Sequence, residues 1–235
     1  MIEAGMVAIV TGASKGIGRA VAIELLARGV HVVGTSRSGA NFDGLAAAST
    51  LGGRFHGVRS DVRLEADNRA LIAETLAQFG RLDILVNNAG LGHFAPLGDL
   101  TYAQWDEVLA TNLRGVFSLT KEALPTMIAR RSGAIVMIGS LASRNTFAGG
   151  AAYCASKFGL LGLAECLMLD ARPHNIRVAT IMPGSVDTDF HPGDDHAWML
   201  TAEDVGKSVI HVLKSEDSCL VSRVELRPFQ VRSAG

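Results

Sequence analysis

Tyr153 and Lys157 stand four positions apart in an alanine- and leucine-rich run, a spacing that could support proton transfer. On a helix, side chains at i and i+4 share one face, so the phenol and the ammonium are expected to point the same way. A free tyrosine has a pKa near ~10 and is a poor acid or base at neutral pH. A neighbouring cation favours the phenolate and is expected to lower that pKa, which would suit Tyr153 to general acid–base catalysis. Alone the pattern is weak, because a packed tyrosine and a surface lysine can share a face by accident.

A glycine-rich turn lies between a β-branched apolar run at residues 7–10 and an amphipathic run that stops at Gly29. It reads Thr11-Gly12-Ala13-Ser14-Lys15-Gly16-Ile17-Gly18. In a strand–turn–helix unit, glycines let the backbone approach a phosphate, and the helix N-terminus presents N–H groups to the anion. The spacing G-x-x-x-G-x-G differs from the commoner G-x-G-x-x-G of dinucleotide folds. Its position between a strand and a helix still predicts a dinucleotide site.

The residues after the second predicted strand, at 30–35, bear on the choice of dinucleotide. Where an NAD site carries an acid for the ribose diol, this chain has Ser36 and Arg37. Arg37 could hold a 2′-phosphate that a carboxylate would repel, and Lys15 in the glycine turn adds a second positive charge. We therefore expect NADP(H), with NAD(H) as the alternative if both bases are ordinary solvated residues.

Other polar or small residues follow predicted strands, at the edge where open α/β sheets bind ligands. Asp61, after the third strand, could accept from an adenine amino group or cap the next helix. The fourth strand runs into Asn87-Asn88-Ala89-Gly90, the fifth ends at Ser140, and the sixth is followed by Pro183-Gly184. Asn112 interrupts a helical pattern at residues 101–124. Asparagine is a poor helix former, so a compensating role is expected there.

Six or seven predicted strands alternate with helices along the chain, without an internal repeat or a linker. This alternation predicts one α/β domain over residues 1–235, with a Rossmann-like, doubly wound, mainly parallel seven-stranded sheet covered by helices on both faces. A short helix is expected within residues 40–50, and the helix from Thr101 should end before Pro125. The irregular residues 189–200, which include His191, His196 and Trp198, are expected to form a substrate lid.

Composition excludes several other classes of protein. The 235 residues are 48% hydrophobic, and 22 basic and 23 acidic residues are well mixed, with a formal net charge of −1. The chain has no basic stripe that would indicate a nucleic-acid or membrane partner, and no secretory signal or membrane-spanning run is recognisable. Three scattered cysteines lack metal-ligand spacing, so neither a disulfide framework nor a metal site is expected. We expect a soluble, cytoplasmic protein with a small-molecule substrate.

Taken in order, these motifs strongly resemble those of the short-chain dehydrogenase/reductase family in its compact single-domain form. The resemblance covers the chain from about residue 7 to residue 188. Its motifs are the glycine turn, Asn87 to Gly90, Asn112, Ser140, Tyr153-x-x-x-Lys157 and Pro183-Gly184. The subset most resembled is the 3-oxoacyl-(acyl-carrier-protein) reductases and their carbonyl-reductase relatives. The resemblance implies hydride transfer between NADP(H) and a ketone or secondary alcohol, and a 3-oxoacyl thioester is one candidate for the substrate.

The resemblance also implies a role for each matched position. Tyr153 would donate the proton to the carbonyl oxygen, Lys157 would lower its pKa and bind the nicotinamide ribose, and Ser140 would stabilise the charge developing on that oxygen. Asn112 would hold a water that links Lys157 to solvent. The cofactor would be held by Gly12, Ser14, Gly16, Ile17 and Gly18 at the pyrophosphate, Asp61 and Val62 at the adenine, Asn88, Ala89 and Gly90 at the adenosine ribose, and Pro183, Gly184, Val186 and Thr188 at the nicotinamide.

Substrate recognition and assembly are less defined by the sequence. The candidates for substrate contact are His93, Phe94, Leu141 and Phe147, although such loop residues are as often structural. The chain lacks the glycine-rich tail that family members commonly use in a tetramer interface, yet a homodimer or homotetramer is still expected. Two functional alternatives stay open, namely an NAD-dependent alcohol dehydrogenase of the same family and a non-catalytic dinucleotide-binding regulatory protein.

Overall fold

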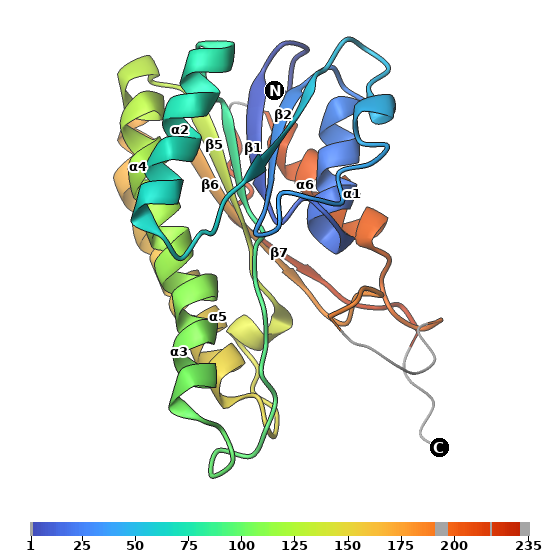
Figure 1. Ribbon diagram of the computed structural model, residues 1–235, viewed down its shortest axis with the longest axis vertical. Helices are drawn as coiled ribbons and strands as arrows, with labels where there is room; N and C mark the ends of the chain where they lie inside the picture. The colour runs from blue at the N-terminus through green and yellow to red at the C-terminus, as the bar shows by residue number, and fades with distance from the viewer. Residues whose placement is uncertain (1, 191–196, 217, 231–235) are drawn as a thin grey trace.

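A seven-stranded parallel sheet runs through the middle of the protein (Figure 1). The computed structural model describes residues 2–190, 197–216 and 218–230. The strands lie in the order β3-β2-β1-β4-β5-β6-β7, and every neighbouring pair is parallel. They are β1 (Val7–Thr11), β2 (His31–Ser36), β3 (Phe55–Arg59), β4 (Ile84–Asn87), β5 (Gly133–Ile138), β6 (Ile176–Pro183) and β7 (Arg223–Leu226). The predicted doubly wound sheet is confirmed.

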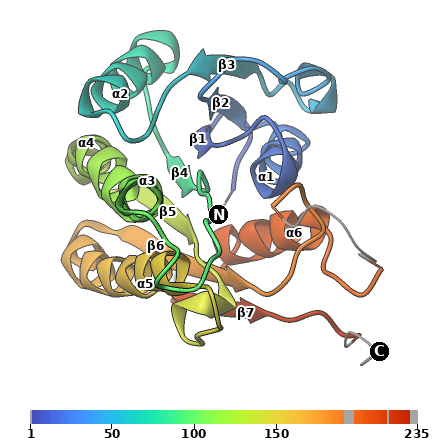
Figure 2. The same cartoon turned by 60° about the horizontal axis from the view of Figure 1, so that its bottom comes forward.

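Helices cover both faces of this sheet (Figure 2). On one face, α1 (Gly16–Leu26) lies beside α6 (Ala202–Leu213). The other face carries α2 (Glu65–Phe79), α4 (Gly115–Arg130) and α5 (Ala151–Ala171). Parallel strands need a crossover between them, and in this chain the crossovers contain helices, so helices packed on the faces of the sheet follow from the strand–helix alternation of the sequence.

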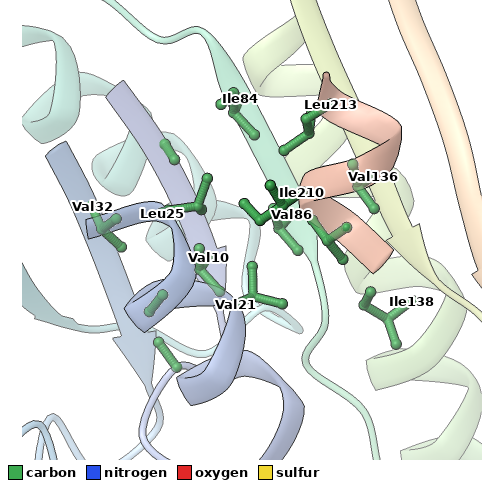
Figure 3. Close-up of a cluster of buried hydrophobic side chains, with 14 of the residues drawn as sticks. Val10, Val21, Leu25, Val32, Ile84, Val86, Val136, Ile138, Ile210 and Leu213 are labelled. Carbon is green, nitrogen blue, oxygen red and sulfur yellow. The ribbon is translucent and has the colours of Figure 1, made fainter. Parts of the chain in front are cut away.

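The strands contribute to two separate apolar clusters because successive side chains alternate between the faces. In β1, Val10 packs in the cluster under α1 and α6, together with Leu25 and Ile210 (Figure 3). Ile9 belongs to the cluster that α2, α4 and α5 cover. Burial on both faces explains why the central strands read as continuous apolar runs rather than as alternating patterns.

The short helix predicted for residues 40–50 is absent. This segment contains only the 3₁₀ turn η1 (Ala46–Ala48). Asn41 and Gly44 adopt left-handed φ angles of 66° and 74°, which a right-handed helix does not accommodate. The prediction was wrong because two residues that favour a left-handed backbone interrupt the apolar spacing of this segment.

The long helix predicted for residues 101–124 is instead three continuous segments and extends further. α3 (Tyr102–Leu109) passes into a π-helical turn, η2 (Ala110–Arg114), and then into α4. α4 continues through Pro125 to Arg130, so the predicted end before Pro125 was wrong. Ala123 and Met127 on either side of this proline are fully buried, and their packing outweighs the local cost of a proline in the helix.

One helix among the described residues is long and apolar enough to cross a membrane by length and composition alone. It is α5 with the 3₁₀ turn that follows, Ala151–His174. Leu160, Ala164 and Leu167 of this helix are buried in the cluster on the sheet. One face of this helix is therefore part of the core, while Phe158 and Leu169 are exposed.

Candidate active site

The candidate active site lies at the carboxyl ends of the strands, where β1 and β4 are neighbours although they are distant in the chain. The strand order changes direction at this pair, and open α/β sheets bind their ligands outside such a switch point. The segments after β1, β4, β5 and β6 all carry predicted site residues to this edge. Motifs spread over most of the sequence therefore meet in one region.

Lys157 is buried in α5 and reaches the end of β5. Its Nζ donates a hydrogen bond to the carbonyl oxygen of Ile138 at 2.8 Å, and it lies 5.6 Å from the centre of the Tyr153 ring. Burial lowers the pKa of Lys157 from 10.5 to about 8, because a buried ammonium loses its hydration. The hydrogen bond favours the charged form, but the effect of burial on the pKa is larger. The predicted proximity of Lys157 to Tyr153 is confirmed.

The predicted lowering of the pKa of Tyr153 was wrong for this structure. Burial raises the pKa of Tyr153 to about 12, and a hydrogen bond with the Ser140 side chain only partly offsets this rise. The rings of Phe94 and Phe190 lie against the tyrosine, each with 5.6 Å between ring centres. An apolar surrounding disfavours a phenolate, and Lys157 donates to Ile138. The phenol is therefore kept protonated, which is the form that a proton donor needs.

Ser140 directly follows β5 and is fixed at the start of the 3₁₀ turn η3 (Leu141–Ser143). Its Oγ accepts from the Ala142 N–H at 3.1 Å, and its own N–H donates to Ser143 Oγ at 3.3 Å. The Ser140 side chain also lies close enough to Tyr153 to lower the pKa of its phenol. Two hydroxyl groups thus converge on one point, an arrangement that can hold a carbonyl oxygen and the charge developing on it.

Asn112 is buried in the π-helical turn and connects three segments. Its Oδ1 accepts from the Leu91 N–H at 2.9 Å, and its Nδ2 donates to the Leu91 carbonyl oxygen at 2.8 Å and to Ser156 Oγ at 3.1 Å. Ser156 in turn donates to the Tyr153 carbonyl oxygen at 2.7 Å. The expectation of a compensating role for Asn112 is met by this clamp, while the water-holding role implied by the resemblance stays a prediction.

The first turn of α1 leaves its N–H groups without a side-chain cap. Lys15 at the N-cap makes no side-chain hydrogen bond to the turn, and the turn contains no acidic residue. By contrast, α3 and α6 each begin with a capping box built on an N-cap threonine. An uncapped helix N-terminus can bind an anion. The predicted pyrophosphate position, with Gly16, Ile17 and Gly18 in this turn and Ser14 just before it, therefore fits a dinucleotide.

The glycine turn is supported by the loop after β4. A Cβ at Gly18 would overlap the Gly12 carbonyl oxygen and lie 2.5 Å from Asn88 Nδ2, so this position requires glycine. Asn88 Nδ2 donates to the Thr11 carbonyl oxygen at 2.8 Å. Thr11 Oγ1 accepts from the N–H groups of Asn88 and Ala89, both at 2.9 Å. Asn88 and Ala89, both predicted at the adenosine ribose, thus donate their N–H groups to Thr11. Gly90, the third residue predicted there, is exposed.

Glu107 on α3 holds a charged cluster at the predicted adenosine end of the site. Its Oε1 lies 3.2 Å from Arg63 Nη1 and 3.6 Å from Arg37 Nη1, and its Oε2 lies 2.9 Å from His93 Nε2. The hydrogen bond with His93 is the largest cause of a lowered pKa of Glu107. We call Arg37, Asp61, Arg63, His93 and Glu107 the Glu107 cluster.

Asp61, predicted to accept from adenine, is bound by its neighbour Arg63. Arg63 Nη2 lies 2.6 Å from Asp61 Oδ2, and Nε lies 2.9 Å from Oδ1. This forked hydrogen bond is the largest cause of a lowered pKa of Asp61. Val62 next to it is buried against Gly115. Asp61 therefore has a structural partner, and its contact with adenine stays a prediction.

The segment after β6 lies against the glycine turn. Lys15 Nζ is 3.0 Å from Asp189 Oδ2, and a Cβ at Gly16 would lie 3.2 Å from Thr188 Cγ2. Val186 forms an isolated parallel bridge with Leu200. Pro183 ends β6, and the N–H of the next residue, Gly184, donates to the carbonyl oxygen of Leu226 at 2.8 Å. Of the predicted lid at 189–200, residues 191–196, with His191 and His196, lie outside the described residues.

The predicted substrate residues fall into two groups. Phe94 and Phe147 belong to an aromatic cluster with Tyr153, and 5.8 Å separates their ring centres. His93 is bound to Glu107, which agrees with a structural role, and its contact with substrate stays a prediction. Leu141 lies beside Gly184, 3.2 Å from where a Cβ on that glycine would be. The described part of the chain has no group of three or more metal-ligating side chains.

The family of this chain follows from its similarity to known proteins. The sequence profile described as "short chain dehydrogenase" matches residues 6–197. The chain belongs to the short-chain dehydrogenase family. As a member, it is an oxidoreductase that acts on a carbonyl or CH–OH group with a nicotinamide dinucleotide.

Similar short-chain dehydrogenases span between 79% and 98% of the chain. A sepiapterin reductase from Chlorobaculum tepidum is 35% identical over 231 residues, which cover 94% of this chain and 95% of that protein. The 3-oxoacyl-(acyl-carrier-protein) reductase FabG of Escherichia coli is 38% identical over 188 residues, covering 79% of this chain and 75% of FabG. A metagenomic short-chain oxidoreductase solved with NADP superposes with a TM-score of 0.87 at 35% identity, over 98% of this chain and 100% of that one.

Sequence reasoning missed two residues of this dehydrogenase that hold the site together. Ser156 is fully buried between Asn112 and Tyr153, and a serine three residues after Tyr153 on one helix was the available signal. Glu107 gave no signal, because its partners Arg37, Arg63 and His93 come from other segments of the chain. Only the fold brings these four side chains together.

Proposed function

We propose that this short-chain dehydrogenase is an NADP(H)-dependent carbonyl reductase that converts a ketone into a secondary alcohol. The observation that carries the proposal is the meeting of the Tyr153 phenol with the Ser140 hydroxyl, close to the buried Lys157. A sensor that only bound a dinucleotide would have no need of this second set of polar groups. The reverse oxidation uses the same groups, and the alternative of an NAD-dependent alcohol dehydrogenase differs only in cofactor and direction.

Each polar group of the site has a role in the proposed reduction. The bound dinucleotide supplies the hydride, and the protein supplies placement and electrostatics. Ser140 holds the substrate oxygen by a hydrogen bond, and Tyr153 transfers its phenolic proton to that oxygen as negative charge develops. Lys157 is a cation close enough to the ring to stabilise the phenolate left behind. Asn112 and Ser156 keep the Tyr153 backbone in place.

The preference for NADP(H) rests on Arg37. It is the first residue after β2 and its side chain is 62% exposed, so it is accessible to a 2′-phosphate. Arginine binds phosphate through charge-assisted hydrogen bonds. Glu107, 3.6 Å away, is a competing partner for Arg37. The NADP complex of the metagenomic relative supports the same choice.

The substrate is proposed only as a carbonyl compound with an apolar part. Two relatives are named for different substrates, a sepiapterin and a 3-oxoacyl group on a carrier protein. Assembly as a homodimer or homotetramer and a cytoplasmic location are proposals that rest on the resemblance and the composition. Light scattering of the purified protein would test the first, since a monomer would contradict it.

The test of the proposed function is to follow oxidation of NADPH and of NADH at neutral pH with β-ketoacyl thioesters, cyclic diketones, aryl ketones and pteridine ketones. Tyr153→Phe serves as the blank, because it keeps the ring but removes the proton. We expect turnover with NADPH that falls by about 10²- to 10⁴-fold in the variant, while NADPH binding stays within about twofold. Undiminished turnover in Tyr153→Phe would contradict the role of Tyr153. Dinucleotide binding without turnover of any carbonyl would favour the regulatory alternative.

A further inference from the structure

Phe94 is the centre of an aromatic cluster that surrounds Tyr153. Its ring centre lies 5.6 Å from that of Tyr153, 5.8 Å from that of Phe147 and 5.9 Å from that of Phe190. Phe190 also contacts Tyr153, with 5.6 Å between ring centres. The three phenylalanines come from three separate segments, after β4, after β5 and after β6. Three loops of the substrate edge thus each contribute one ring to the cluster, and the rings of Phe94 and Phe190 contact the proton donor.

Two rings of this cluster are exposed at the surface. Phe94 is 46% exposed and Phe147 is 48% exposed, so each leaves part of a ring face or edge uncovered. Grouped exposed apolar side chains mark binding sites more often than isolated ones do. Apolar groups packed only for stability would be expected in the clusters on the sheet, where Val10 and Ile9 are fully buried.

The backbone holds two of these rings in a defined arrangement. The Ala95 N–H donates to the Gly149 carbonyl oxygen at 3.0 Å, which joins the loop of Phe94 to the loop of Phe147. The Phe147 ring lies so close to Gly150 that a Cβ there would be 2.7 Å from it. A site with fixed side chains loses less entropy when a ligand binds. The rings are therefore positioned before a substrate arrives.

Two polar side chains close to these rings in the sequence are already paired. His93, next to Phe94, is bound to Glu107 at 2.9 Å, and Arg144, near Phe147, lies 3.2 Å from Glu225. These pairs leave the aromatic rings as the main recognition element beside Tyr153. A ligand with a flat aromatic ring fits such a surface, because ring edges and faces attract one another beyond simple burial of area.

We propose that Phe94, Phe147 and Phe190 form an aromatic wall that selects ketones whose carbonyl carbon is attached to an aromatic or conjugated planar ring. This inference rests on the proposed carbonyl-reductase function and names its substrate class. The wall binds the ring of the substrate and leaves the carbonyl oxygen within reach of Tyr153 and Ser140. Saturated acyl chains gain binding free energy from the same surface only by burial of apolar area, without the attraction between rings. The wall therefore discriminates against them.

The test compares acetophenone with cyclohexyl methyl ketone, which has the same carbon skeleton but a saturated ring. Tyr153-dependent kcat/KM is measured for both ketones with NADPH, and the aryl-to-cyclohexyl ratio is taken for the wild type and for each variant. Taking the change in this ratio removes the difference in intrinsic reactivity of the two ketones. Phe94→Leu and Phe147→Leu keep apolar bulk but remove the ring. Phe117→Leu is the matched control, because this phenylalanine is 49% exposed on α4 and lies beside Leu163, ten positions along α5 from Tyr153.

We expect the aryl-to-cyclohexyl ratio to fall roughly two- to twelvefold in Phe94→Leu and in Phe147→Leu, mainly through KM for acetophenone, and to stay unchanged in Phe117→Leu. A ratio unchanged in both test variants would overturn the aromatic wall. So would an equal gain for both ketones, which would mean that the rings only obstruct the site. Turnover of other carbonyls but not of acetophenone would also overturn the wall while leaving the reductase function intact. Absence of Tyr153-dependent turnover with any carbonyl would instead overturn the proposed function itself.

Discussion

Lys157 Nζ donates to the carbonyl oxygen of Ile138 at 2.8 Å while lying 5.6 Å from the centre of the Tyr153 ring. The lysine therefore ties α5 to the end of β5 at the point where the phenol is placed. The same burial lowers the pKa of Lys157 to about 8 and raises that of Tyr153 to about 12. Both shifts favour the uncharged side chains, so charging either group in this buried site costs free energy.

The buried Lys157 is expected to make stability depend on pH. Its pKa is about 8 in the folded protein and 10.5 ordinarily, so between these values the unfolded chain binds more protons and stability rises with pH. Below pH 8 the buried ammonium of Lys157 lowers the free energy of unfolding by its full amount, on the order of 3 kcal/mol. Lys157→Met removes this ammonium and its cost. The free energy of unfolding of the wild type should therefore rise relative to that of the variant between pH 8 and about 10.5. Urea unfolding at several pH values measures this, and parallel pH curves would contradict it. The lost hydrogen bond to Ile138 adds only a constant offset.

Arg37 is expected to decide the choice between the two dinucleotides. A hydrogen bond to a charged group contributes about 1.5–3 kcal/mol, so Arg37→Ala should weaken NADPH binding by roughly 10- to 150-fold and leave NADH binding almost unchanged. Titration calorimetry with both nucleotides measures the effect. Arg69→Ala is the control, because Arg69 on α2 is similarly exposed and pairs with Glu122 on α4. Equal losses for NADPH and NADH would show that Arg37 does not bind the 2′-phosphate.

Glu107 is expected to weaken the binding of NADPH, because it competes for Arg37 and places a negative charge near the proposed 2′-phosphate site. Exposed ion pairs contribute up to about 1 kcal/mol, so Glu107→Gln should tighten NADPH binding by up to about fivefold. NADH binding should change little. In an Arg37→Ala background the gain should disappear, which a double-mutant cycle of dissociation constants would reveal. A gain that persists without Arg37 would refute this coupling.

Asn112 is expected to contribute to stability as well as to the site. Asn112→Ala removes two hydrogen bonds with Leu91 and one with Ser156 in a buried position. Leaving buried polar groups unpaired costs about 1–3 kcal/mol per group, so the free energy of unfolding should fall by about 2–4 kcal/mol. Asn145→Ala is the matched control, because it loses one exposed hydrogen bond to Leu141; its loss should stay below about 1 kcal/mol. Equal effects of the two variants would argue against the clamp.

The sequence by itself determined the architecture and the location of the site. Apolar runs separated by helical patterns predict a doubly wound sheet, and the order of the strands then brings Gly12, Asn88, Ser140 and Pro183 to one edge. This inference succeeds because strand and helix periodicity are local properties, and connection rules leave few ways to assemble them. Tyr153 and Lys157 could be paired in advance for the same reason, since both lie on one helix.

Only the tertiary structure decided the electrostatics of the site. Glu107 meets Arg37, Arg63 and His93 from three other segments, and Asn112 clamps Leu91 twenty-one positions away. The pKa of Tyr153 rises although a lysine stands four residues later, because Phe94 and Phe190 desolvate the phenol. Desolvation and ion pairing depend on which side chains surround a group in space. Spacing along the chain predicts which residues are neighbours on one helix, but it does not predict how deeply side chains from other loops bury them.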